Sequence, residues 1–280
     1  MSVSSNINSV ILFADDLYAR PLREAFSEKN IVVRQPQQGL SKETTLAVLE
    51  QCMRLLDRTD AVRMFYKLFE HWTLRSPILA LREALQRPMP EQGVYFFFDP
   101  DEGTRFSNAL GRLVRIGTHG VSVGSKATLR DRLRTHLGTS DGFGNHRSSV
   151  FRLHVGEAII RRDGLRKRFA QWGSGQSAPA LARERERPLE KKVSEVISKL
   201  HVATVEVADV AMKTSARAVM ETSAIGLFTE NCQPVEHPGP NWLGRSSAHG
   251  LIARTGLWNL RDVGSEADLS IIETLRARLS

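Results

Sequence analysis

The chain has 280 residues, enough for one large domain or two modest ones. Hydrophobic residues make up 41% and charged residues 25%, and no apolar run approaches the roughly 18 residues of a membrane span, so the composition favours a globular protein and argues against a membrane-spanning one. The net charge of +8 favours a partner with a phosphate backbone, although a solvated basic surface would give the same charge.

The start of the chain and its cysteines bear on the cellular compartment. Residues 1–8 are polar and lack the basic and apolar regions of a signal peptide. The two cysteines, Cys52 and Cys232, form neither a CxxC pair nor a disulfide framework. These features predict a reduced, cytoplasmic setting.

Residues 1–88 are predicted to form a mostly helical N-terminal domain, whose role the sequence does not indicate. Short apolar stretches at 9–13 and 31–33 are typical of strands. Four stretches have apolar residues at helical spacing, namely 15–29, 43–56, 61–72 and 78–85. Pro88 and Pro90 then interrupt the pattern, and we place a domain boundary there.

Two strands and a helix follow this boundary. Residues 93–98 and 112–118 are predicted to be strands, and antiparallel pairing is the simplest arrangement for neighbours in sequence. A helix then begins near Thr128, and its apolar stripe consists of Leu129, Leu133 and Leu137.

The remaining elements are mostly helical, apart from an alternating stretch at 202–207 that is typical of a strand. Helices are predicted over 150–160, 189–200, 215–228 and 267–279. The stretch between the first two of them is basic and expected to be exposed. Its candidate contacts to a nucleic-acid backbone are Arg161, Arg162, Arg166 and Lys167.

The order strand, strand, helix, further helices, strand and helix resembles the GIY-YIG nuclease family. Gly93-Val94-Tyr95 stands at the family's first motif, and Arg115-Ile116-Gly117 stands at its second, where Arg115 replaces the usual tyrosine. The resemblance implies an α+β fold, with a small three-stranded antiparallel sheet flanked by helices. The nuclease-like domain would span 89–245 with an insertion at about 138–200, and 246–280 would be a C-terminal extension.

The resemblance also implies a catalytic set. Tyr95 would be the general base that takes a proton from the attacking water, and Arg115 could supply the positive charge that this role needs. Arg132 and His136, four residues apart on one helix face, would stabilise charge on the phosphate and assist the water or the leaving oxygen.

A metal site is implied on the helix after the third strand. There Glu221 would hold one Mg²⁺ or Mn²⁺, since hard carboxylate oxygens suit these ions, and Glu190 is the competing assignment. His119 is predicted to enter the same cleft, and Asn241 to hold backbone or phosphate. By contrast, four histidines close in sequence lack zinc spacing, so no zinc cluster is expected among His119, His136, His146 and His154.

The function expected from these features is a metal-dependent endonuclease that hydrolyses nucleic-acid phosphodiesters, with DNA as the preferred substrate. A catalytically inactive nucleic-acid-binding module on the same fold is the first alternative, and Arg115 in place of tyrosine favours it. A protein-interaction scaffold, with the basic stretches as solvated surface, is the second. Metal-dependent cleavage, salt-sensitive binding without cleavage, and no binding distinguish the three hypotheses.

Overall fold

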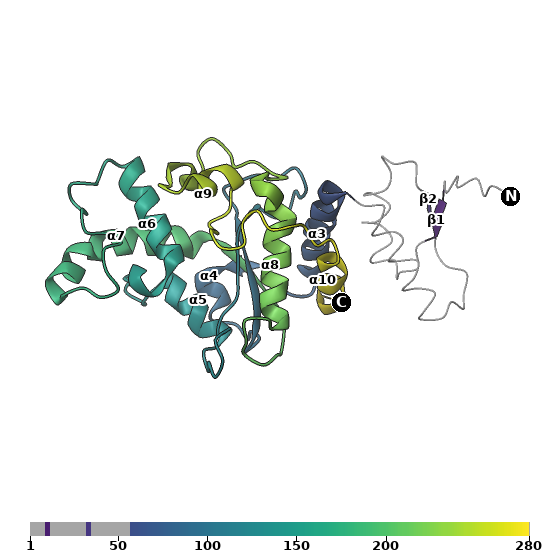
Figure 1. Ribbon diagram of the computed structural model, residues 1–280, viewed down its shortest axis with the longest axis horizontal. Helices are drawn as coiled ribbons and strands as arrows, with labels where there is room; N and C mark the ends of the chain where they lie inside the picture. The colour runs from purple at the N-terminus through teal and green to yellow at the C-terminus, as the bar shows by residue number, and fades with distance from the viewer. Residues whose placement is uncertain (1–8, 12–31, 35–56, 280) are drawn as a thin grey trace. The chain divides into compact units, whose positions relative to one another are not determined.

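The computed structural model describes residues 9–11, 32–34 and 57–279 (Figure 1). Contacts divide the chain into two units, and every predicted site residue belongs to the larger one, Ser76–Asp268. The smaller unit includes the helices α3 (Arg58–Trp72) and α10 (Ile271–Leu279), which pack against each other. The predicted domain division at residue 88 therefore stays a prediction.

Elements near the N-terminus were predicted from short patterns. The strands β1 (Ser9–Ile11) and β2 (Val32–Arg34) pair in parallel, and they coincide with two stretches predicted as strands. The helices predicted over 15–29 and 43–56 lie outside the described residues. Helix α3 begins a few residues before its predicted start, because the Asp57 side chain caps it by accepting a hydrogen bond from the backbone N–H of Asp60 (2.9 Å).

The larger unit contains a four-stranded antiparallel sheet in the order β3-β6-β4-β5. Its strands are β3 (Leu79–Ala80), β4 (Gly93–Asp99), β5 (Arg112–Gly117) and β6 (His201–Glu206). The predicted α+β class is confirmed, as is the small antiparallel sheet. A fourth strand joins the predicted three, since β3 and the short helix α4 (Leu81–Ala84) occupy the stretch predicted as one helix.

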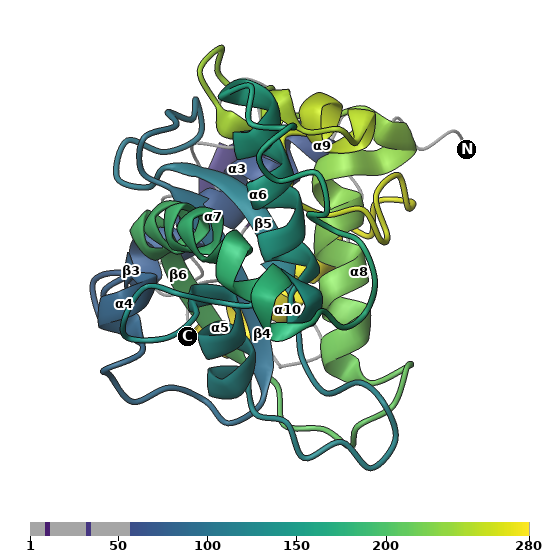
Figure 2. The same ribbon diagram turned by 90° about the vertical axis from the view of Figure 1, so that its left-hand side faces the viewer.

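Helices cover both faces of this sheet (Figures 1 and 2). Three of them pack with Tyr95 and Phe97 of β4 in one hydrophobic core, namely α5 (Leu129–Leu137), α6 (Val150–Arg162) and α7 (Ala180–Lys199). Helix α8 (Ala216–Thr229) packs against β4 and β5 from the other side. No helix in the described part of the chain is both long and apolar enough to cross a membrane.

The glycines of the two sequence motifs are required by close packing. A β-carbon at Gly117 would overlap the ring of Tyr95, and one at Gly93 would overlap the carbonyl group of Val205 on the neighbouring strand. Because any other residue would push these strands apart, the two motifs hold β4 in register with β5 and β6.

The free edge of β5 is covered by a distant segment of the chain. The side-chain amide of Asn259 accepts a hydrogen bond from the backbone N–H of Ile116 (3.1 Å) and donates one to its carbonyl oxygen (2.9 Å). One residue earlier, the backbone N–H of Trp258 donates to the carbonyl oxygen of Val114 (2.7 Å). The segment 257–261 is thereby fixed against the edge strand.

A buried ion pair between α6 and α7 fixes the end of α5. Arg152 is fully buried and donates to the carbonyl oxygens of His136 (2.9 Å) and Leu137 (3.0 Å), while its Nη2 lies 2.6 Å from Glu190 Oε2. Burial alone would raise the pKa of Glu190, but His146 and Arg152 outweigh it and lower that pKa. Glu190 is thus an ionised structural residue, which argues against its assignment as a metal ligand.

Candidate active site

A cavity of about 670 Å³ lies beside the end of β5, between α5, α8 and the segment 257–261. Four of the predicted site residues line it together: Arg115, His119, Arg132 and Glu221. These residues come from β5, the loop after it, α5 and α8 respectively. The cavity therefore gathers predicted site residues from Arg115 to Glu221, which are 106 positions apart in the sequence.

Arg132 reaches the cavity from the first turns of α5. A capping box starts this helix, in which the Thr128 side chain and Asp131 bond to each other's backbone N–H. Leu129 and Leu133 bury the opposite face of the helix in the core. Within the described residues, the buried Nε of Arg132 has no hydrogen-bond partner, so the guanidinium keeps a donor for an anion.

Arg115 is held along the cavity wall. Its Nη1 donates to the carbonyl oxygen of Trp258 (2.8 Å), and its guanidinium carbon lies 4.8 Å from the ring centroid of Phe151. Its Nε is buried without a hydrogen-bond partner in the part of the chain that the structure describes. Arg115, which replaces the tyrosine of the family's second motif, thus supplies a fixed positive charge and a hydrogen-bond donor that no described residue engages.

His119 is 4% exposed, and both of its ring nitrogens lack a hydrogen-bond partner among the described residues. Burial, followed by the positive charge of Arg217, lowers the pKa of His119 to about 4, so the ring is neutral at pH 7. Arg217 also places this loop, because its Nη2 donates to the carbonyl oxygen of Gly120 (3.0 Å) and its Nη1 forms an ion pair with Asp209 (2.9 Å). The neutral ring can accept a proton.

Two carboxylates line the cavity, Asp131 and Glu221, and Glu221 is the candidate metal ligand because Asp131 already caps α5. Burial raises the pKa of Glu221 to about 7, the nearby charge of Asp262 acts in the same direction, and Arg115 and Arg132 oppose the shift. A hard carboxylate beside an open cavity fits Mg²⁺, which keeps several of its water ligands. The residues present therefore fit a single Mg²⁺ or Mn²⁺ held by Glu221.

Tyr95 and His136 form a buried pair outside the cavity lining. Both are 0% exposed, and a hydrogen bond joins Tyr95 Oη to His136 Nε2 (2.8 Å). The other ring nitrogen of His136 bonds to Ser149 Oγ (2.8 Å), and burial, with Arg115 next, lowers the pKa of His136 well below its usual value. A base must reach the water that it activates, and a fully enclosed hydroxyl does not. This burial argues against the predicted catalytic roles of Tyr95 and His136.

The predicted substrate contacts other than His119 do not line this cavity. Asn241 is exposed and, together with Arg162, lines a separate hollow of about 400 Å³. Arg161, Arg166 and Lys167 are exposed at the end of α6 and in the turn after it. The asparagine that does line the cavity is Asn259, which the sequence pattern did not single out because its contact with β5 lies 143 residues away along the chain.

Comparison with known proteins identifies the family. The GIY-YIG domain family matches residues 56–280, which is most of the chain. The chain therefore belongs to the GIY-YIG domain family and is a member of a nuclease superfamily. No curated protein and no solved structure matches it.

Proposed function

We propose that this protein is a metal-dependent endonuclease that hydrolyses phosphodiesters in DNA. The observation that carries the proposal is one cavity in which nitrogen donors without partners among the described residues, on Arg115, His119 and Arg132, meet the carboxylate of Glu221. Unsatisfied buried donors cost free energy unless a ligand pairs with them. An anionic phosphate is the ligand that this set of donors suits.

The two arginines would bind and stabilise the scissile phosphate. Arg132 and Arg115 each keep an Nε donor that no described residue engages, and the planar guanidinium group matches the geometry of phosphate oxygens. Negative charge grows on these oxygens in the transition state, so fixed positive charge lowers the barrier more than it tightens ground-state binding. Because Trp258 and Phe151 already hold Arg115, its charge needs little reorganisation during the reaction.

His119 would accept the proton of the attacking water. It is neutral at pH 7, and its ring nitrogens have no hydrogen-bond partner in the part of the chain that is described, whereas the hydroxyl of Tyr95 is enclosed. A bound phosphate would raise the pKa of His119 from about 4 towards the working pH, where a general base is most efficient. We assign the buried pair of Tyr95 and His136 to positioning, because it joins β4 to α5.

Glu221 would hold the Mg²⁺ or Mn²⁺, which when bound neutralises phosphate charge and stabilises the leaving oxygen. The exposed basic side chains after α6 are proposed to contact the DNA backbone outside the cavity. Those residues are Arg161, Arg162, Arg166 and Lys167.

The proposal is tested by cleavage of supercoiled and branched DNA with Mg²⁺ or Mn²⁺. The intact chain is expected to nick DNA only when metal is present, and Glu221→Gln is expected to lose about 10²-fold or more in rate, since it removes the only proposed protein ligand of the metal. Glu195→Gln, at an exposed position of α7, is the matched control and should keep the activity. Cleavage that persists in Glu221→Gln would contradict the metal assignment.

A catalytically inactive binding module is the second candidate, and the burial of Tyr95 and the replacement at Arg115 favour it. It predicts salt-sensitive DNA binding, weakened by Arg132→Ala, without cleavage by the intact chain under any metal. Binding and cleavage measured on the same protein preparation separate the two functions.

The raised pKa of Glu221 predicts a pH-dependent effect on stability. A carboxyl group whose pKa rises to about 7 on folding contributes stability below its usual pKa and loses it as pH rises through 7. Without metal, Glu221→Gln is therefore expected to gain about 2–3 kcal/mol in free energy of unfolding relative to the wild type between pH 5 and pH 8.5. Urea denaturation at the two pH values measures this gain, and Glu195→Gln should show none.

A further inference from the structure

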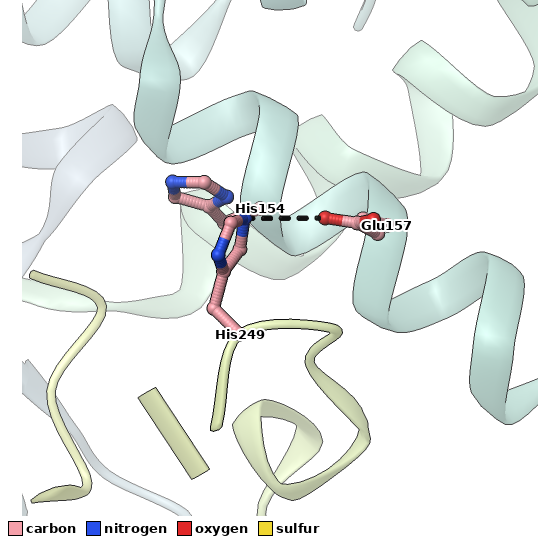
Figure 3. Close-up of side chains that lie close together, drawn as sticks. All are labelled: His154, Glu157 and His249. Carbon is pink, nitrogen blue, oxygen red and sulfur yellow. Dashed lines mark ion pairs between the residues drawn. The ribbon is translucent and has the colours of Figure 1, made fainter. Parts of the chain in front are cut away.

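A second cluster of potential metal ligands joins α6 to the start of α9 (Gly250–Thr255), and Arg115 of the candidate active site is close enough to lower the pKa of His154. His154 and Glu157 are three residues apart on α6, so they share a face of the helix, and His249 faces them from the N-cap of α9. One ligand atom from each residue lies within 4.8 Å of the other two, and the three side chains point toward one another (Figure 3). None of the three residues lines the active-site cavity.

The contacts within this cluster leave the buried ring of His154 unsatisfied. His154 is 3% exposed, yet neither of its ring nitrogens has a hydrogen-bond partner among the described residues. His249 Nε2 lies 3.8 Å from Glu157 Oε2, too far for a hydrogen bond, and the two histidine rings are in contact with centroids 4.6 Å apart. A buried imidazole without a partner costs free energy, and a cation between the three groups would remove that cost.

We propose that His154, Glu157 and His249 form a Zn²⁺ site. Two imidazole nitrogens and one carboxylate oxygen are a donor set that zinc binds, with three protein ligands and one position left for water. Nitrogen donors also disfavour Mg²⁺ and Ca²⁺, which prefer oxygen. This site is therefore chemically distinct from the carboxylate site proposed at Glu221.

The geometry needs only a small contraction to hold the ion. Ligand atoms around tetrahedral zinc lie roughly 3.4 Å apart, given metal–ligand distances of about 2.1 Å. The present separations reach at most 4.8 Å. His249 and Glu157 have side chains that are 44% and 25% exposed, so both can move by changing rotamer, whereas the buried His154 is the fixed point.

Zinc at this position would connect α6 to the segment that covers β5. His249 is the N-cap of α9 and Gly256 is its C-cap, and Trp258 and Asn259 follow on the edge of β5. Since Trp258 and Asn259 also line the cavity, the ion would stabilise one wall of the active site without touching the substrate. The ion is thus inferred to support this wall, with its fourth position open to water, and the inference extends the proposed function without depending on it.

The test uses the full chain, free of any affinity tag, stripped of metal with a chelator and then incubated with excess Zn²⁺. Mass spectrometry of the protein after gel filtration gives the zinc content, and competition with a chromophoric chelator gives the Kd. One Zn²⁺ per chain is expected, and His249→Ala and Glu157→Gln should each weaken binding by at least about tenfold. X-ray absorption at the zinc edge should show two imidazole ligands.

Two control variants keep this test specific. His237→Ala removes an exposed histidine outside the cluster, and Glu221→Gln removes the proposed magnesium ligand, so both should bind zinc as the wild type does. Zinc should raise the thermal unfolding temperature of the wild type and of both controls, but not of His249→Ala. Absence of bound zinc, equal affinity in His249→Ala, or loss of zinc in Glu221→Gln would overturn the proposal.

Discussion

Replacing His119 with glutamine is expected to lower the rate of DNA cleavage by about 10²–10⁴-fold, the usual contribution of a general base. Glutamine keeps a polar side chain of similar size but cannot take a proton from water at neutral pH. By contrast, Tyr95→Phe removes only a hydroxyl that is enclosed with His136, so its rate should fall by less than about tenfold. The measurement is the single-turnover rate at saturating Mg²⁺ for both variants and the wild type.

The comparison between these two variants decides which residue is the base. Both are checked first for unchanged folding by circular dichroism and thermal unfolding, since Tyr95→Phe leaves the buried His136 nitrogen without its partner. If Tyr95→Phe abolishes cleavage while His119→Gln remains active, the enclosed hydroxyl must become accessible when DNA binds, and the assignment proposed for His119 is wrong.

Arg132→Ala is expected to lower the cleavage rate by about 10²–10³-fold, because it removes a preorganised donor from the phosphate. Arg132→Lys should recover part of this loss, since lysine restores the charge but not the planar pair of donors. Arg134→Ala is the matched control, because Arg134 is exposed on the same helix and does not line the cavity. Single-turnover rates for the three variants give the comparison.

One side effect of Arg132→Ala must be removed by the choice of conditions. The charge of Arg132 lowers the pKa of Glu221, so its loss raises that pKa further and weakens metal binding at neutral pH. Rates measured at pH 8.5 with saturating Mg²⁺ exclude this contribution. A loss equal to that of Arg134→Ala under these conditions would show that Arg132 does not act on the phosphate.

Local patterns predicted most of the sheet and its helices. The strands at 93–98 and 112–118 were recognisable from apolar residues between turn-forming ones, and the helix with Arg132 from its leucine stripe. The stretch 78–85 was predicted as one helix. It begins instead with a strand, because Leu79 and Ala80 pair with β6, and such a distant partner leaves no mark on eight residues of sequence.

The positions of the candidate site residues were predictable only where a motif indicated them, and their catalytic roles stay predictions. Arg115, Arg132 and Glu221 line one cavity as their motif positions implied, whereas Asn259 was missed because its role depends on contact with a strand far away in the chain. The alternation of side chains along β4 indicates which residues share a face of the sheet. It does not indicate that α6 covers the face that carries Tyr95. Whether a side chain can reach the cavity depends on packing between elements that are far apart in the chain. A single sequence does not reveal that packing.

Asn259 gives the last part of the chain a protective role. Its amide takes up the hydrogen-bonding groups of Ile116 that β5 would otherwise offer to another strand. A chain that stopped before residue 257 would retain every predicted catalytic residue, yet it would present an open strand edge on which a second copy could assemble. Loss of this segment is therefore expected to cause self-association and aggregation. These would obscure any effect of the truncation on catalysis.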